Sequence, residues 1–283
     1  MKLNNVCLEI KDYAVSGEDF KLVYNDNLEL LETVPQPEAH QLSRYYKSED
    51  YISHTDNKRN LLEWTYHLVK RISLNRKVKL INSFNLIGKD VLDIGCGTGD
   101  FLKTAQQRGW NVLGVEPNEK ARELANQKTN NKVYDVKSLY ELKEKSFDVI
   151  TLWHVLEHLP QKEQHIEICK KLLKPHGRIV VAVPNYKCFD ASYYKNYWAG
   201  YDVPRHLWHF SQNAIKLLFQ NVKMEVIKTL PMKFDAFYVS LLSEKYKNGK
   251  MNFIRAFMIG LRSNLKAKQS GEYSSLIYVI KNT

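Results

Sequence analysis

Short apolar runs alternate with amphipathic segments through the middle of the chain, between residues 88 and 184. The apolar runs have the length of buried strands, and they predict β-strands over residues 91–94, 111–115, 132–134, 147–153 and 178–183. The segments between them predict helices over residues 101–108, 118–127 and 161–173, the second of them capped by Asn118. Because parallel neighbours need a crossover helix to return the chain, this alternation predicts an α/β fold with a parallel, doubly wound sheet.

The two flanks of this alternation have different patterns. Before it, apolar residues recur at helical spacing with basic residues between them, which predicts an amphipathic helix over residues 58–79. After it, an aromatic-rich stretch over residues 186–210 must pack on another part of the protein. Beyond that stretch we expect helices over residues 214–219, 234–246 and 252–266, a strand over 223–229, and a final antiparallel strand over 275–280.

The net charge of +11 is spread unevenly. Residues 1–57 hold 5 Lys/Arg and 11 Asp/Glu, a balance of −6, so residues 58–283 hold the remaining 37 and 20, a balance of +17. We therefore divide the chain into a small N-terminal appendage, 1–57, and a main domain, 58–283. The basic main domain is compatible with nucleic acid, an anionic membrane surface or a phosphorylated substrate, and equally with a solvated surface without a partner.

Composition narrows the class of protein further. A chain with 44% hydrophobic and 26% charged residues is globular, and no apolar run has the length of a membrane span or the form of a signal peptide. We therefore expect a cytoplasmic protein. The four cysteines, at positions 7, 96, 169 and 188, are too far apart to predict a disulfide framework or a paired-cysteine zinc site.

Three glycines, Gly95, Gly97 and Gly99, lie between the first strand of the alternation and its helix. Such a loop lets a ligand approach backbone N–H groups at a helix N-terminus. A dinucleotide site would need its third glycine at Asp100, and the carboxylate of Asp93 would repel a pyrophosphate. Asp93 instead suits a cationic amino group, and Glu116, at the end of the second strand, is placed to accept hydrogen bonds from two ribose hydroxyls.

Residues 91–100, VLDIGCGTGD, and 114–118, GVEPN, closely resemble the glycine motif and acidic loop of class I S-adenosylmethionine-dependent methyltransferases. The resemblance continues without a break over residues 88–184. It implies a Rossmann-like sheet of seven mostly parallel strands, a helical cap, and S-adenosyl-L-methionine as the cofactor.

The resemblance also implies the cofactor-binding residues. The glycine loop would lie against the methionine part of the cofactor, and Glu116 would bind its ribose. Asp135 and Val136 would flank the adenine. Trp153 and His154 would lie beside the sulfonium. In chain order the set is Asp93, Gly95, Cys96, Gly97, Glu116, Pro117, Asp135, Val136, Trp153 and His154.

Residues 45–54, YYKSEDYISH, and 202–211, DVPRHLWHFS, are similar to one subgroup of these enzymes, in which a zinc ribbon precedes the methyltransferase domain. The ribbon ligands are largely lost here. Cys7 remains, but its expected partner is Ile10, and the second pair would fall near Asn25 and Leu28. Because one cysteine cannot supply four ligands, we predict no bound metal and a metal-free remnant of the ribbon.

Two other activities, that of a zinc peptidase and that of a nucleic-acid methyltransferase, each match some features of the sequence. Residues 154–158 match H-x-x-E-H, a zinc peptidase motif, but they follow directly on a strand and Pro160 comes two residues later, whereas that motif needs a helix. Nucleic-acid methylation fits the basic charge and the abundant aromatic residues. However, the chain has no N-P-P-aromatic sequence after the fourth strand and no cysteine nucleophile there, so a nucleic-acid partner is disfavoured.

Several residues are candidates for handling the methyl acceptor. His206 and His209 are candidates for taking its proton, and Arg205 for holding an anionic group. The alternative for both histidines is packing of the aromatic loop. Tyr46, Tyr51 and His54 are candidates for a lid over the cofactor, because loop aromatics exclude water and this segment precedes the first helix of the domain, with simple packing as the alternative.

These observations predict methylation of a small or lipid-linked acceptor on oxygen or carbon. A tRNA or rRNA methyltransferase and a non-catalytic cofactor-binding scaffold remain alternatives. Two insertions, about 185–210 and 230–272, are expected to cap the site. In the second, an apolar helix face carrying Phe253, Ile254 and Phe257 among basic residues predicts either peripheral contact with an anionic membrane or a core helix packed on Phe234, Phe237 and Leu241.

Overall fold

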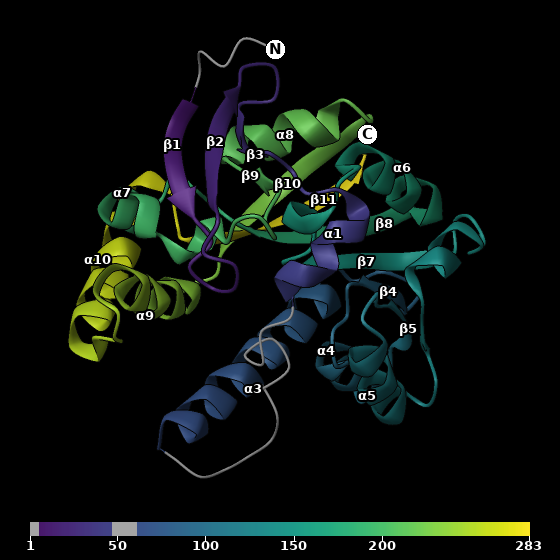
Figure 1. The fold of residues 1–283 in the computed structure, drawn as a ribbon. Helices are drawn as coiled ribbons and strands as arrows, with labels where there is room; N and C mark the ends of the chain where they lie inside the picture. The colour runs from purple at the N-terminus through teal and green to yellow at the C-terminus, as the bar shows by residue number, and fades with distance from the viewer. Residues whose placement is uncertain (1–5, 47–60) are drawn as a thin grey trace.

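The structure is a computed structural model that describes residues 6–46 and 61–283 (Figure 1). Its main feature is a seven-stranded sheet with the strand order β10-β11-β8-β7-β4-β5-β6. The strands are β4 (Asp90–Ile94), β5 (Asn111–Val115), β6 (Val133–Tyr134), β7 (Phe147–Trp153), β8 (Leu173–Pro184), β10 (Met224–Pro231) and β11 (Ser275–Asn282). β4 to β8 are parallel, and β11 pairs antiparallel with both β8 and β10. The predicted fold class is confirmed.

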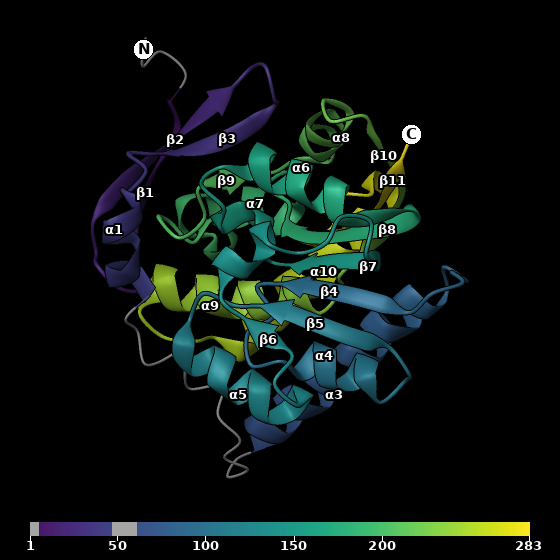
Figure 2. The same cartoon turned by 90° about the vertical axis from the view of Figure 1, so that its right-hand side faces the viewer.

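Helices cover both faces of this sheet (Figure 2). On one face, α3 (Leu61–Asn82) and α4 (Asp100–Gln106) pack on Val91, Val149 and Val180, with α5 (Glu119–Thr129) beside them. On the other face, α6 (Lys162–Leu172) and α8 (Gln212–Gln220) pack on the alternate strand residues, such as Leu92 and Ile150. Because both faces are buried, the central strands are mostly apolar, with Asp93, Asp148 and Thr151 as buried exceptions, which explains why they stood out in the sequence.

A second, smaller sheet contains β1 (Val6–Lys11), β2 (Asp19–Asn25), β3 (Leu30–Val34) and β9 (Trp208–His209), all paired antiparallel. α1 (Ala39–Leu42) and the short helix η1 (Ser43–Tyr46) follow β3. β9 belongs to the aromatic stretch of the main domain, so the predicted appendage shares a sheet with it. Ile10, the expected zinc-ligand position, is buried, whereas Cys7 is exposed. Position 10 therefore contributes to packing.

The aromatic stretch packs beneath the small sheet. It forms α7 (Phe189–Tyr194) and the short helices η4 (Lys195–Tyr197) and η5 (Ala199–Tyr201). Their buried rings join apolar residues of β1 to β3 in one cluster, which we call the N-terminal core: Ile10, Phe20, Leu22, Leu31, Tyr45, Cys188, Ala191, Tyr194, Trp198, Tyr201, Val203 and Ile259. The fully buried Asp190 accepts hydrogen bonds there from Trp198 Nε1 (2.8 Å), Ser263 Oγ (2.6 Å) and Ser274 Oγ (2.7 Å).

The insertion between β10 and β11 forms two packed helices, α9 (Asp235–Asn248) and α10 (Phe253–Ser270), to one side of the sheet (Figure 1). α10 buries its small residues, and Gly260 lies so close to α9 that an added Cβ would be 2.8 Å from Phe237. The predicted apolar face is largely exposed instead: Phe253 is 47% exposed, Ile254 77%, Phe257 59%, Met258 61% and Leu261 43%. The core-helix alternative is therefore wrong for this face, although Phe257 stacks on Phe237.

None of the helices in the described ranges combines the length and the apolar character that a membrane crossing requires.

Candidate cofactor and acceptor site

The predicted cofactor residues gather at the carboxyl edge of the sheet, where β7, β4, β5 and β6 end side by side. The glycine loop connects β4 to α4 and is held by Val115 O, which accepts from the N–H groups of Gly95 (2.8 Å) and Cys96 (3.2 Å). Gly95 and Gly97 have φ values of 68° and 54°, which favour glycine. A Cβ on Gly95 would lie 2.6 Å from Val155, whereas one on Gly97 would meet no atom within 4 Å. Gly97 thus leaves the loop open on its outer side.

Glu116 at the end of β5 is buried and organises this loop. One carboxylate oxygen accepts from Gly97 N and the other from Asn118 N, each at 2.9 Å. Burial raises the pKa of Glu116, and these two backbone donors oppose the rise. Asn118 caps α5 as predicted, because its side chain accepts from Ala121 N at 3.0 Å.

Asp93, at the end of β4, is buried beside the loop. Thr151 Oγ1 donates to its carboxylate at 2.5 Å. Burial raises the pKa of Asp93 to about 7, partly offset by that hydrogen bond and by the nearby Lys77. The Lys77 ammonium lies 4.3 Å from the centre of the Trp153 ring, and its own pKa is lowered by burial. A carboxylate that costs this much to ionise is suited to a cationic ligand.

The remaining members of the predicted set border the same edge. Burial raises the pKa of the Cys96 thiol, so it is protonated at neutral pH. Pro117 is exposed, and Val136 is half-buried after β6. Asp135 begins a short helix by accepting from Lys137 N at 3.0 Å, and it lies 3.5 Å from Arg122 in an ion pair.

At the end of β7, Trp153 and His154 lie next to this loop. The Trp153 Nε1 is buried and has no hydrogen-bond partner within residues 6–46 and 61–283. His154 has a φ of 58° and lies between two carboxylates, with Asp235 at 3.2 Å and Glu157 at 3.4 Å. Burial alone would lower the pKa of His154, but the two carboxylates raise it to about 9. Asp235 comes from α9, so the second insertion reaches the carboxyl edge.

The family described as "Methyltransferase domain" matches residues 67–229, which is more than half of the chain. The chain belongs to this methyltransferase family. The family predicted from the glycine motif is thereby confirmed; the match begins after the predicted ribbon remnant.

Curated relatives match a part of this methyltransferase. The ubiquinone biosynthesis O-methyltransferase of Dechloromonas aromatica is 34% identical over 110 residues, 36% of this chain and 47% of the relative. The protein of the same name from Psychrobacter cryohalolentis is 32% identical over 133 residues, 44% of this chain and 52% of the relative. The chain therefore spans about half the length of the curated relatives that it matches.

Solved structures share the fold. The magnesium protoporphyrin IX methyltransferase of Synechocystis PCC 6803, with bound SAH, has a TM-score of 0.55 at 17% identity and covers 84% of this chain and 97% of its own. A 1,6-didemethyltoxoflavin-N1-methyltransferase of Burkholderia thailandensis has a TM-score of 0.53 at 15% identity, with 96% and 99% covered. At these identities the similarity shows that the methyltransferase fold is shared, and it carries no information about the substrate.

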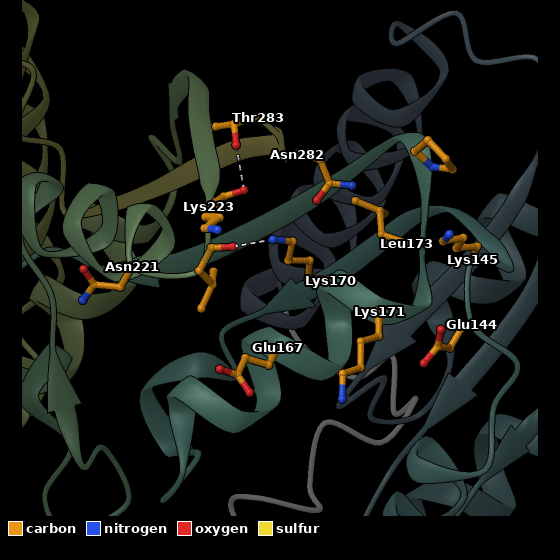
Figure 3. Close-up of a pocket in the computed structure, with 12 residues that line it drawn as sticks. Glu144, Lys145, Glu167, Lys170, Lys171, Leu173, Asn221, Lys223, Asn282 and Thr283 are labelled. Atoms are coloured by element: carbon orange, nitrogen blue, oxygen red, sulfur yellow. Dashed lines mark hydrogen bonds between the residues drawn. The ribbon is translucent and has the colours of Figure 1, made fainter.

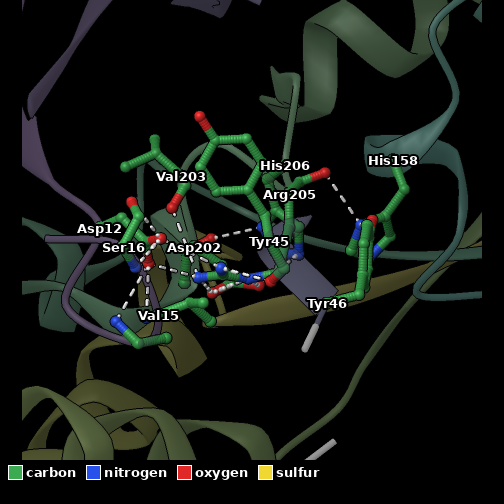
Figure 4. A network of polar contacts seen from close by, with 12 residues as sticks. Asp12, Val15, Ser16, Tyr45, Tyr46, His158, Asp202, Val203, Arg205 and His206 are labelled. Atoms are coloured by element: carbon green, nitrogen blue, oxygen red, sulfur yellow. Dashed lines mark hydrogen bonds and ion pairs between the residues drawn. The ribbon is translucent and has the colours of Figure 1, made fainter. Parts of the chain in front are cut away.

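Arg205 has a different role from the predicted contact with an anionic acceptor (Figure 4). Its guanidinium is buried and donates to Asp12 at 2.9 Å, to Asp202 at 2.6 Å and to the backbone oxygen of Tyr45 at 3.1 Å. All three guanidinium nitrogens are engaged in these contacts or in the Asp202 bonds of Nε. The prediction is corrected: the charge of Arg205 joins the turn after β1 to the loop before β9.

The two histidines predicted to take a proton are both buried. His209 Nε2 lies 3.0 Å from Thr33 Oγ1 of β3, and burial lowers the pKa of His209 well below its usual value. These contacts of His209 agree with the alternative in which the histidine packs the aromatic loop. His206 Nδ1 lies 3.0 Å from the backbone oxygen of Gly200, and its Nε2 is 3.9 Å from Asp202.

Of the three predicted lid residues, Tyr46 lies within the described chain. Its hydroxyl is 3.1 Å from His158 Nδ1, so it contacts the turn that follows β7 (Figure 4). Tyr51 and His54 lie outside the described residues, and their predicted role stays a prediction.

A pocket of about 740 Å³ opens far from these residues, at the amino ends of β7 and β8 (Figure 3). Four lysines line it, and Lys170 donates to the backbone oxygen of Val222 at 2.7 Å. The glycine loop and Glu116 lie at the opposite edge, so this pocket is not the predicted site.

Sequence reasoning missed four residues of the carboxyl edge: Lys77, Thr151, Glu157 and Asp235. Two of them occupy elements that were predicted as ordinary helices, and Thr151 was taken as strand core. Glu157 was considered only within the rejected peptidase motif. The usable signal for Glu157 was its place among three ionisable residues, His154, Glu157 and His158, directly after a buried strand.

Proposed function

We propose that the protein transfers a methyl group from S-adenosyl-L-methionine to an oxygen of a small or lipid-linked acceptor. The observation that carries this proposal is the edge formed by Asp93, the open glycine loop and Glu116. The residues fit the cofactor: a buried carboxylate lies where an amino group would bind, and Gly97 leaves room for close approach. The orphaned Trp153 Nε1 is a further donor at this edge.

When bound, the cofactor would supply the methyl group and its sulfonium charge. Glu116 would exchange its bond to Gly97 N for ribose hydroxyls, and Asp93 would ionise against the amino group. The protein's main contribution is alignment, since an in-line transfer needs nucleophile and methyl group in a fixed geometry. Of the two predicted histidines, we place His206 next to the acceptor, because His209 Nε2 is already paired with Thr33 Oγ1.

The name shared by the curated relatives, ubiquinone biosynthesis O-methyltransferase, supports oxygen as the acceptor atom and a lipid-linked acceptor. The test is formation of S-adenosylhomocysteine with cell extract separated into lipid, small-molecule and RNA pools. We expect product with the lipid or small-molecule pool. Product with RNA alone would support the tRNA or rRNA alternative. Calorimetric binding of S-adenosylhomocysteine with no product in any pool would identify a non-catalytic scaffold.

We also propose that the exposed face of α10 contacts an anionic membrane that holds the acceptor. The side chains of Phe253, Ile254, Phe257, Met258 and Leu261 on this face are more than two-fifths exposed, and Arg255, Arg262 and Lys266 on the same helix are exposed too. Apolar residues among cations are typical of helices that lie in a membrane interface.

Flotation with phosphatidylglycerol vesicles tests this contact. We expect the protein to float at low salt and to be released as salt rises. Ile254→Glu should abolish flotation, whereas Ile87→Glu, at another fully exposed apolar position, should not. A protein that stays in the soluble fraction at low salt, or that responds equally to both changes, would exclude membrane contact through α10.

A further inference from the structure

Three potential metal ligands meet where the chain leaves β7. Glu157 and His158 lie on the short helix η3 (Leu156–His158), and His206 comes from the loop before β9. One ligand atom from each of the three residues lies within 4.8 Å of the others. The rings of His158 and His206 are 4.6 Å apart and meet edge to face. The chain thus brings two imidazoles and one carboxylate together from segments almost 50 residues apart.

The hydrogen bonds of both histidines leave the same nitrogen available. His158 Nδ1 lies 3.0 Å from the backbone oxygen of Arg205, and His206 Nδ1 lies 3.0 Å from that of Gly200. Because a carbonyl oxygen only accepts, each Nδ1 carries the proton and each Nε2 carries a lone pair. Metal-binding histidines are usually oriented in this way, with the other N–H donated to a carbonyl or carboxylate.

Glu157 is an independent indication of a cation. It is 1% exposed, and neither of its carboxylate oxygens has a hydrogen-bond partner among residues 6–46 and 61–283. One oxygen lies 3.4 Å from His154 Nδ1 in an ion pair. Asp202 also faces the cluster, 3.9 Å from His206 Nε2, but it is already paired with Arg205. The His154 ion pair balances the charge of Glu157, but it fills no hydrogen-bond acceptor position, so lone pairs of both oxygens are left for a further ligand.

We propose that Glu157, His158 and His206 bind one divalent transition-metal ion, such as Mn²⁺ or Zn²⁺. Two imidazoles and one carboxylate are a ligand set that these ions accept. Ligand atoms at about 2.0–2.2 Å from an ion lie at most about 4.4 Å apart, so the side chains need to close only slightly. With three protein ligands, a coordination position is left for water or, if the proposed function holds, for the acceptor oxygen.

This site differs from both predictions made on the sequence. In H-x-x-E-H the two histidines are the ligands and the glutamate is not, whereas here His154 pairs with Asp235 and Glu157 is itself a ligand. It also departs from the expectation that the protein binds no metal, which considered only the ribbon positions. The third ligand, His206, is supplied by the tertiary fold.

Titration of the chelator-treated full-length protein with MnCl₂, followed by the electron paramagnetic resonance signal of free Mn²⁺, tests the proposal. We expect one bound ion per chain. His158→Gln and His206→Gln should each weaken binding at least tenfold, while His176→Gln, at an exposed histidine elsewhere, should leave it unchanged. No binding by the unaltered protein, or equal binding by all three variants, would overturn the proposal.

A second measurement covers variants that fold poorly. Glu157→Gln keeps the shape of the side chain and removes its charge. We expect ZnCl₂ to raise the thermal midpoint of the unaltered protein by several degrees and that of Glu157→Gln by little. An equal rise in both would overturn the proposal. Neither experiment contains cofactor or acceptor, so failure of the methyl-transfer assay would leave the metal site standing, and the reverse also holds.

Discussion

Acidic residues in two regions of this protein have opposite environments. At the carboxyl edge, Asp93 and Glu116 have pKa values raised by burial, and the Arg122 guanidinium donates to the backbone oxygen of Glu116 and not to its carboxylate. Beside the N-terminal core, burial would also raise the pKa values of Asp12 and Asp202, but Arg205 and further hydrogen bonds lower them. In the first region burial favours the neutral form of the carboxyl groups, so a cationic ligand would stabilise their charged form, whereas the second region uses charge to hold segments together.

The difference teaches how to separate a binding site from a structural ion-pair network. A buried carboxylate that favours its neutral form destabilises the folded protein and is explained by a ligand. A buried carboxylate paired with arginine is already compensated. We predicted Arg205 as a substrate-binding residue from its neighbours in the sequence. Its contacts with Asp12 and Asp202 instead place it in a structural ion-pair network.

The largest effect is expected at Arg205. Arg205→Leu leaves Asp12 buried without its cation, and removal of one partner of a buried pair costs roughly 3–5 kcal/mol. Urea unfolding should show this loss. Lys174→Leu is the matched control, because Lys174 bridges Asp90 and Asp148 while about 31% exposed and should cost about 1 kcal/mol or less. Similar losses for both variants would contradict the assignment of Arg205 to a buried network.

The second prediction concerns ligand binding at the carboxyl edge. Glu116→Ala should weaken S-adenosylhomocysteine binding by roughly 1.5–3 kcal/mol, the range for hydrogen bonds to a charged group. Isothermal titration calorimetry measures the change. Glu141→Ala, at an exposed carboxylate after β6, should bind as the unaltered protein does. Unchanged affinity in Glu116→Ala would contradict the proposal that Glu116 binds the ribose.

Removal of a helix N-cap should cause a smaller loss of stability. Asn118→Ala removes the cap of α5 and should cost about 1 kcal/mol in stability. Ser211→Ala removes the cap of α8 and should cost more, because Ser211 is buried and also donates to the backbone oxygen of Glu29 at 3.2 Å. Denaturant midpoints measure both. A larger loss for Asn118→Ala would reverse the expected order.

The last effect is the pH dependence caused by Asp93. Its pKa is about 7 in the folded protein and 3.8 without burial, so the folded state holds the extra proton between these values and loses stability as pH rises through them. Asp93→Asn should therefore raise the thermal midpoint at pH 8, leave it unchanged at pH 3.5, and weaken cofactor binding. Asp12 has the opposite sign: its lowered pKa gives stability above pH 4 that is lost on acidification. A lower midpoint for Asp93→Asn at pH 8 would contradict the analysis.

The sequence by itself determined the seven-stranded sheet and the edge at which we propose that the cofactor binds. Buried parallel strands are mostly apolar on both faces, and the loop residues lie within a few positions of the strand ends, so a linear pattern contains their geometry. β7 and β5 were predicted with the observed bounds, and Asn118 caps its helix as expected. β8 begins five residues earlier than predicted, because its first residue pairs with Phe147.

The tertiary structure alone decided how distant residues combine. Asp12 and Arg205 are 193 positions apart, and β9 joins the small sheet through two residues that show no strand pattern of their own. The same holds for the cluster of Glu157, His158 and His206. The pattern of α10 showed an apolar face but not what covers it, and the close contact of Gly260 with α9 turned that face outward. Periodicity records which face of an element is apolar, whereas pairing of faces depends on long-range packing that no local pattern contains.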